Sequence, residues 1–186
     1  MTLTVTVVVG NPKPASRTLK VAVSLVEHLL EPDSYDLEVI DLAEYADQMF
    51  DWPSETLAEL NQRVADSDLA VFASPTYKAT YTGLLKAFLD RYPAGGLHGV
   101  TAIPVHTGAD LSHSMGPDVH LAPLLTELGA VVLGRGVYFV AGNMDQLDEI
   151  IGKAAADYRD KLGRLARVAA AVATTDATDV AVPAQV

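Results

Sequence analysis

Short apolar segments alternate with amphipathic segments five times along the chain, and this alternation limits the folds open to it. The apolar segments are rich in Val, Ile, Leu and Ala, which is typical of strands buried on both faces of a sheet. The segments between them repeat apolar residues at helical spacing. The pattern therefore predicts an α/β fold in which a parallel sheet carries helices on both faces.

The expected strands are Leu3–Val9, Tyr35–Leu42, Ser67–Pro75, Gly99–Gly108 and Ala130–Leu133, and the expected helices are Ala15–Leu30, Ser54–Ala65, Gly83–Arg91, Pro117–Leu128 and a last helix from Asp145 past Leu165. Pro104 weakens the fourth strand, because proline cannot donate a ladder hydrogen bond. The segment "GVYFVAG" (136–142) is expected to extend or flank the sheet. We expect one domain over residues 1–173 and a flexible tail over 174–186, where no periodicity is present.

Composition excludes several classes of protein. The net charge of -11 argues against nucleic-acid binding, which requires basic surfaces. The chain has no cysteine, so disulfides, thiolate catalysis and cysteine-based zinc sites are excluded. The N-terminus lacks the pattern of a signal peptide, and no apolar run reaches membrane-spanning length. We therefore expect a soluble, cytoplasmic protein that does not associate with membranes.

The loop "GNPKPASRT" (10–18) contrasts with this acidic background. In parallel sheets, ligands bind beyond the carboxyl ends of the strands, where this loop follows the first strand. Lys13 and Arg17 supply charge, Ser16 and Thr18 supply hydroxyls, and a helix N-terminus supplies free N–H groups. This set suits a phosphate monoester, although an ordinary helix cap at Ser16 gives the same pattern. Neither a Walker A loop nor a G-x-G-x-x-G fingerprint is present, which favours a mononucleotide.

The segment "SPTYKATYTGLLKAFLDRYP" (74–93) follows the third strand. Pro75 and Tyr77 are able to frame a flat heterocycle, and the N–H groups of Tyr77, Lys78 and Ala79 are able to donate to it. The alternative is a loop whose tyrosines pack on the core. Thr82 is expected to cap the next helix. Lys86 and Asp90, four residues apart, fit a surface ion pair.

These two motifs together resemble the NAD(P)H-dependent FMN reductase family. The first loop matches a pattern of the form G-S-P-x-x-x-S-R-T, and the second matches S-P-x-Y-x-x-x-x-x-G-x-L-K-x-x-x-D. The resemblance runs from the first strand to about the last helix. It implies a flavodoxin-like, doubly wound, five-stranded parallel sheet with strand order 2-1-3-4-5. The closest similarity is to reductases that supply reduced flavin to two-component monooxygenases.

The resemblance also implies site residues. Ser16, Arg17 and Thr18 would hold the FMN phosphate, aided by Asn11, which replaces a frequent Ser, and by Lys13. The ribityl chain and ring would lie along the second loop, at Pro75, Thr76, Tyr77, Lys78 and Ala79.

A third loop, "HTGADLSHS" (106–114), departs from the family pattern. It keeps Thr107, Gly108 and His113 for contacts with the flavin edge, but Ala109 and Asp110 replace Gly and Ser. Ala109 is expected to divert the loop, since alanine avoids positive φ. Asp110 is expected to bring negative charge near the ring, and either to lower flavin affinity or to favour release of reduced flavin.

Other interpretations of this loop stay open. His106, Asp110 and His113 form a weak candidate metal site. Ser112 or Ser114 with a His and an Asp forms a weak candidate hydrolase triad, without the G-x-S-x-G elbow. We predict no metal ligand and no catalytic residue, and no chemistry for His120.

The implied reaction is hydride transfer from NAD(P)H to FMN, since the cofactors carry the chemistry. An FMN-retaining reductase of quinones, azo dyes or metal oxyanions is an alternative, and so is a non-catalytic flavodoxin-like electron carrier. The resemblance implies a homodimer or homotetramer, with 81–92 as either an interface or core packing. The choice between NADH and NADPH stays open, with Lys78, Arg91 or Arg135 as candidate contacts for a 2′-phosphate.

Overall fold

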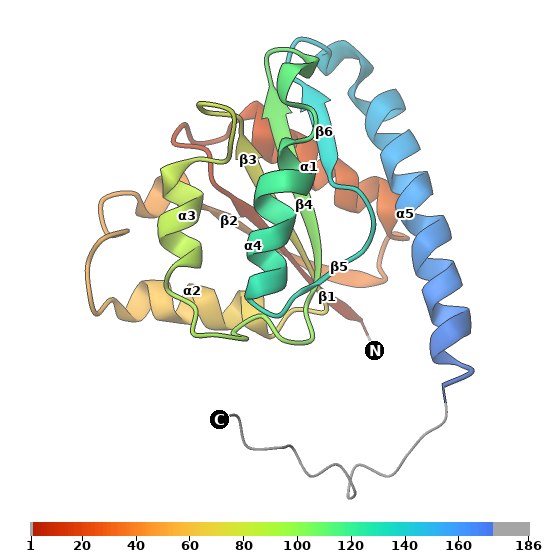
Figure 1. The fold of residues 1–186 in the computed structure, drawn as a ribbon, viewed down its shortest axis with the longest axis horizontal. Coiled ribbons are helices and arrows are strands. Elements are labelled where there is room, and N and C mark those ends of the chain that lie inside the picture. The colour runs from red at the N-terminus through yellow and green to blue at the C-terminus, as the bar shows by residue number, and fades with distance from the viewer. Residues whose placement is uncertain (1, 173–186) are drawn as a thin grey trace, which may run out of the picture.

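The computed structural model describes residues 2–172, and the predicted tail at 174–186 lies outside the described residues. Its strands are β1 (Leu3–Val9), β2 (Tyr35–Asp41), β3 (Leu69–Pro75), β4 (Thr101–Gly108), β5 (Val131–Val132) and β6 (Val137–Val140). They form one parallel sheet in the order β2-β1-β3-β4-β5, with β6 also paired to β4 (Figure 1). The predicted flavodoxin-like sheet with strand order 2-1-3-4-5 is confirmed.

The fifth position of the sheet is occupied by two short strands in succession. β5 pairs with the start of β4, and β6 pairs with its end. Pro104 lies opposite the interruption between them, and its carbonyl oxygen would be 3.0 Å from a Cβ added at Gly136. Because the N–H position and the C=O of one strand residue point the same way, the donor that Pro104 lacks faces this interruption. The ladder therefore loses little by having proline in a central strand.

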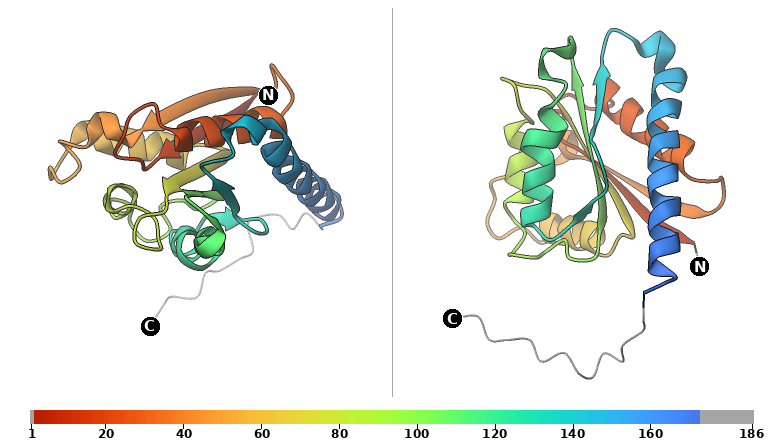
Figure 2. Two further views of the ribbon diagram at one scale, coloured as in Figure 1. Left: turned by 90° about the horizontal axis from the view of Figure 1, so that it is seen from above. Right: turned by 45° about the vertical axis from the view of Figure 1, so that its right-hand side comes forward.

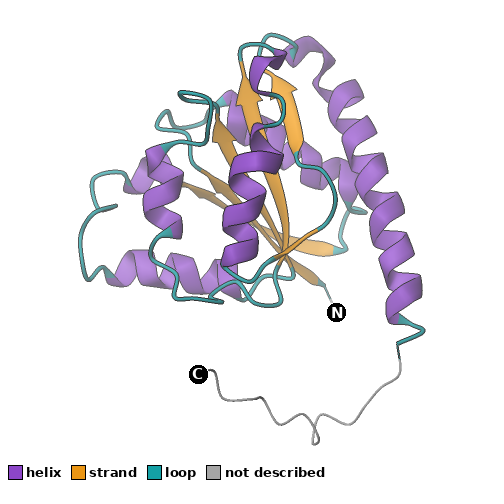
Figure 3. Cartoon of the chain, viewed as in Figure 1, coloured by secondary structure: helices purple, strands orange, loops and turns teal. Residues whose placement is uncertain are grey.

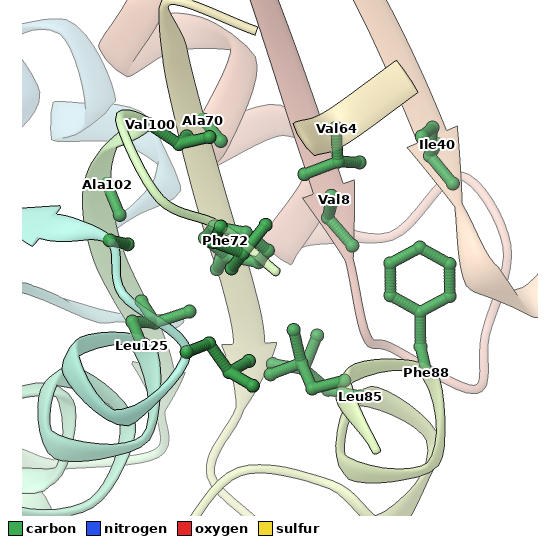
Figure 4. Close-up of a cluster of buried hydrophobic side chains, with 14 of the residues drawn as sticks. Val8, Ile40, Val64, Ala70, Phe72, Leu85, Phe88, Val100, Ala102 and Leu125 are labelled. Carbon is green, nitrogen blue, oxygen red and sulfur yellow. The ribbon is translucent and has the colours of Figure 1, made fainter. Parts of the chain in front are cut away.

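Helices cover both faces of the sheet (Figure 2). The helices α1 (Arg17–Leu29) and α5 (Leu147–Ala169) lie on one face, and α2 (Glu55–Ala65), α3 (Gly83–Leu89) and α4 (Ala122–Glu127) lie on the other. Side chains of alternate strand residues therefore build two separate cores. In the core under α2, α3 and α4, Phe72 lies near the centre, with Leu85 and Phe88 of α3 and Leu125 of α4 around it (Figure 4).

The predicted helix starts follow from their caps. The hydroxyl oxygens of Ser16, Ser54 and Thr82 each accept a hydrogen bond from the backbone N–H three residues later. The expected helix 117–128 differs, because it begins with a π-helical turn at Pro117–Leu121 and becomes α-helical at α4. Pro123 has no N–H to donate into a regular first turn, which accounts for the wider turn before it.

Helix α3 places most of the apolar stretch 81–92 in the core. Leu85, Phe88 and Leu89 are buried, and the Tyr92 hydroxyl donates to the Asn61 carbonyl oxygen. Lys86 and Asp90 form the expected surface ion pair. Within residues 2–172, no helix has both the length and the apolar character required to cross a bilayer.

Candidate functional site

The strands β1, β3, β4 and β6 end at the same edge of the sheet (Figure 3). A pocket of about 390 Å³ is lined by residues at these carboxyl ends. Its size is within the range of small-molecule sites. Eleven of the fifteen predicted site residues line it, from all three predicted loops, and these are Asn11, Lys13, Ser16, Arg17, Thr18, Pro75, Thr76, Tyr77, Thr107, Gly108 and Ala109. Lys78, Ala79, Asp110 and His113 are not among the lining residues.

The N-terminus of α1 forms one side of the pocket. Ser16 is buried, and its hydroxyl oxygen accepts from Leu19 N–H at 3.2 Å, while no described residue accepts the hydroxyl proton. The N–H groups of Arg17 and Thr18 donate to no acceptor among the described residues, as expected in a first helical turn. This end of α1 therefore presents free donors and a positive dipole end to the pocket.

Arg17 is oriented by a contact from across the pocket. Its Nη1 donates to the carbonyl oxygen of Ala141, which follows β6, at 2.9 Å. No carboxylate of the described residues lies within 4.0 Å of the guanidinium. The charge of Arg17 is thus held at the pocket wall and is not neutralised by an acidic partner.

Thr18 connects the first and third loops. Its hydroxyl lies 2.8 Å from that of Thr107 and accepts from the Asn11 amide nitrogen at 3.1 Å. The Asn11 oxygen accepts from Lys13 N–H at 3.0 Å. The Thr18 hydroxyl and the Asn11 amide, both expected near a phosphate, thus also hold the loop in shape. Backbone N–H groups and the Ser16 hydroxyl are the neutral donors at this end that have no acceptor among the described residues.

The second loop is a tight hairpin. Tyr77 N–H donates to Thr80 O at 2.8 Å, and Thr80 N–H donates back at 3.2 Å. The two central residues, Lys78 and Ala79, have φ of 50° and 72°, the left-handed geometry of a type I′ turn. Non-glycine residues adopt this geometry at a cost of about 1 kcal/mol or more each. The Tyr77 N–H is thus engaged within the loop, whereas those of Lys78 and Ala79 have no acceptor among the described residues.

The floor of the pocket depends on Gly108. A Cβ added there would lie 1.8 Å from the Tyr138 hydroxyl oxygen, so only glycine leaves room for that phenol. Tyr138 donates from its hydroxyl to the Asp110 carbonyl oxygen at 2.7 Å, which fixes the third loop. Nearby, the Thr76 hydroxyl is shielded from solvent and has no hydrogen-bond partner among the described residues. A polar ligand group in the pocket is the natural partner for it.

The third loop follows a regular path. Ala109 does not adopt positive φ, which agrees with the expected avoidance of that geometry by alanine. The Asp110 carboxylate is exposed and accepts from Ser112 N–H at 2.8 Å, capping a short 3₁₀ turn at Leu111–His113. This hydrogen bond lowers the pKa of Asp110 below its ordinary value. The structure thus assigns Asp110 a capping contact outside the pocket.

His106 lies on β4 behind this loop and is fully buried. Neither ring nitrogen has a hydrogen-bond partner among the described residues, and a Cβ added at Gly116 would lie 2.8 Å from Nδ1. The Tyr81 ring packs against the imidazole edge to face, with centroids 6.4 Å apart. Burial, assisted by the charge of His120, lowers the pKa of His106 to about 4.

The two other interpretations of the third loop find no support in the geometry. Within residues 2–172, no three His, Asp or Glu side chains gather as a metal-binding group. In the same part of the chain, neither Ser112 nor Ser114 makes a side-chain hydrogen bond with a histidine.

Three further residues line the pocket: Ala15, Lys20 and Ala141. Ala15 has φ of 49°, and its N–H donates to the buried carboxylate of Asp41 at 3.0 Å, a contact across 26 residues that no local pattern indicates. Lys20 follows Arg17 by three residues, so helical spacing alone places the two on one face. Ala141 directly follows β6, so assigning 136–142 to the sheet would have placed Ala141 at a carboxyl end of a strand and among the expected site residues.

Comparison with known proteins agrees with this geometry. Residues 3–145 match the NADPH-dependent FMN reductase family. The chain is 32% identical over 137 residues to FMN reductase (NADPH) of Escherichia coli K12, covering 69% of each chain. It is 31% identical over 148 residues to the NADH-dependent FMN reductase SfnF of Pseudomonas putida, covering 76% of this chain and 80% of that one.

Solved structures show the same likeness. The apo form of the NADH:FMN oxidoreductase EmoB superposes with a TM-score of 0.74 at 25% identity, covering 95% of this chain and 94% of that one. An oxidoreductase of Corynebacterium diphtheriae superposes with a TM-score of 0.76 at 25% identity, covering 88% of this chain and 98% of that one. The chain therefore belongs to the NADPH-dependent FMN reductase family and is an oxidoreductase.

Proposed function

We propose that this chain binds FMN in the pocket at the carboxyl ends of β1, β3 and β4, reduces it with NAD(P)H, and passes the reduced flavin to a monooxygenase. The observation that supports this proposal most strongly is the arrangement of the pocket. One end presents free N–H donors and the unneutralised Arg17, and the other end presents the Pro75–Tyr77 segment. A phosphate monoester suits the first and a flat heterocycle suits the second. The names of the similar E. coli and P. putida proteins support the flavin and the reductant.

In this proposal the protein binds and orients, and FMN when bound supplies the hydride acceptor. The N–H groups of Arg17 and Thr18 and the Ser16 hydroxyl hold the phosphate. The Thr76 hydroxyl, which has no described protein partner, donates to a polar group of the flavin. In this proposal the N–H groups of Lys78 and Ala79, which have no acceptor among the described residues, donate to the ring. No side chain is required as a general acid or base.

The test is NAD(P)H oxidation, followed at 340 nm with and without added FMN. We expect the rate to rise with free FMN and saturate, and the purified protein to lose flavin on a desalting column. A flavin retained on the column, with no acceleration by free FMN, would support an FMN-retaining reductase.

An FMN-dependent NADPH-azoreductase of Staphylococcus saprophyticus, 31% identical over 93 residues, motivates that second candidate. FMN binding with negligible NAD(P)H oxidation would indicate an electron carrier.

We also propose that the chain forms a homodimer or homotetramer. Helix α3 turns its apolar face into the core, so the stretch 81–92 offers little for an interface. Phe50 and Trp52, 85% and 71% exposed, are better candidates, and light scattering after size exclusion measures the assembly directly.

A further inference from the structure

The pocket gathers three cations that have no carboxylate partner among the described residues. Six of the thirteen Lys and Arg side chains lie within 4.0 Å of a carboxylate of the described residues. Three of the other seven, Lys13, Arg17 and Lys20, line this one pocket. In a chain with a net charge of -11, such a cluster indicates a local preference for anions.

Lys20 stands outside the loop motif that carries the family resemblance. It is exposed, lies on α1 one turn after Arg17, and faces the same pocket. No carboxylate of the described residues lies within 4.0 Å of the Lys20 ammonium, and the buried Asp41 of this loop region accepts from the N–H groups of Ala15 and Ala43. The Lys20 ammonium is therefore available to a ligand.

The charges decide which ligand group suits Lys20. A phosphate monoester carries nearly two negative charges near neutral pH. Arg17 and the dipole end of α1 offset roughly one and a half of these. A second cation at the pocket rim, Lys13 or Lys20, completes the neutralisation, whereas a neutral ligand such as riboflavin gains nothing from it.

We infer that Lys20 is a specificity-determining residue that binds a phosphate monoester at the rim of this pocket. The inference deepens the proposed function and rests on it. Two substrates of that function carry such a group: FMN, at the end of its ribityl chain, and NADPH, at the 2′ position. Riboflavin is the counterpart of FMN that lacks this phosphate, and NADH is the counterpart of NADPH that lacks it. Comparing the two members of each pair isolates the contact between Lys20 and the phosphate.

The experiment compares the wild type with Lys20→Gln, Lys20→Arg and Lys153→Gln. Lys153 is a matched control, because it pairs with Glu149 on the exposed side of α5, away from the pocket. Flavin fluorescence gives the Kd for FMN and riboflavin, and initial rates give KM for NADPH and NADH. Loss of one charge near a dianion is expected to weaken binding several-fold at low salt and about twofold near 0.15 M, where the screening length is about 8 Å.

The expected result is a Lys20→Gln penalty confined to one phosphorylated member of a pair, reduced by salt, absent in Lys153→Gln and largely restored in Lys20→Arg. A penalty on FMN but not riboflavin assigns the flavin phosphate, and a penalty on NADPH but not NADH assigns the 2′-phosphate. Equal effects within both pairs, or none, would overturn the inference while wild-type FMN binding still supports the proposed function. A wild type that neither binds FMN nor oxidises NAD(P)H with it would overturn both.

Discussion

His106 should make the stability of this protein sensitive to mild acid. Its ring is fully buried and has no hydrogen-bond partner in residues 2–172, and its pKa in the folded state is about 4 against an ordinary 6.5. Above pH 6.5 the ring is neutral in the folded and unfolded states, so its contribution is constant. As the pH falls from 6.5 towards 4, only the unfolded state takes up a proton, and the free energy of unfolding decreases.

The magnitude follows from the two pKa values. The factor 1 + 10^(pKa − pH) at pH 5 is about 32.6 for the unfolded state and about 1.1 for the folded state. Protonation of His106 therefore lowers the free energy of unfolding by RT ln(32.6/1.1), about 2 kcal/mol, at pH 5 and by only about 0.2 kcal/mol at pH 7. Below pH 4 the decrease in the free energy of unfolding approaches roughly 3 kcal/mol, because the pKa of His106 differs by about 2.5 between the two states and each pKa unit corresponds to about 1.36 kcal/mol. For a domain of this size, 2 kcal/mol corresponds to a shift in Tm of about 4–8 °C.

The assay is guanidinium unfolding at pH 7 and pH 5 for the wild type and His106→Leu. Leucine is apolar and similar in size, so it removes the titration without leaving a buried polar group unpaired. We expect the variant to gain about 2 kcal/mol relative to the wild type on going from pH 7 to pH 5. His98→Leu, at an exposed histidine, is the matched control and should keep the pH dependence of the wild type. Parallel pH dependences for wild type and His106→Leu would refute the reasoning.

Three further changes test the loops of the pocket. Ala79→Gly relieves the φ of 72° and should raise the free energy of unfolding by about 1 kcal/mol in chemical denaturation, whereas Ala156→Gly in exposed α5 should lower it by a similar amount. Gly108→Ala should lower Tm by several degrees and weaken FMN binding, because the added methyl group meets the Tyr138 hydroxyl. An additional Tyr138→Val should recover part of the Tm. An unchanged melting curve for Gly108→Ala alone would contradict the close approach of Gly108 and Tyr138. Arg17→Gln should raise the Kd for FMN about 10–100-fold in a fluorescence titration and change riboflavin binding much less, so a change below about twofold would exclude Arg17 as a phosphate ligand.

Local patterns were sufficient for the framework of the fold. The apolar runs located β1 to β4, and the hydroxyl caps at Ser16, Ser54 and Thr82 placed the starts of α1, α2 and α3. These features depend on residues within a few positions of one another. The carboxyl-end rule for parallel sheets then brought the first and second loops to one edge, where the pocket is found.

Contacts between distant residues were beyond such patterns. The Thr18–Thr107 and Ala15–Asp41 hydrogen bonds join segments 89 and 26 residues apart, and they decide which donors remain free. The position of the third loop also could not be predicted, because it is fixed by the hydrogen bond from the distant Tyr138 hydroxyl to the Asp110 carbonyl oxygen. Pro104 argued against a central strand, and only the interruption between β5 and β6 explains why it is accepted there.

The central claim is that the N-terminus of α1 holds the phosphate of a flavin whose ring lies along the loop after β3. A crystal structure of the protein with FMN tests it most directly. We predict phosphate oxygens within hydrogen-bond distance of the Arg17 and Thr18 N–H groups and of the Ser16 hydroxyl, with the ring beside Pro75 and Tyr77. FMN bound elsewhere, or a pocket still empty at saturating FMN, would contradict the account.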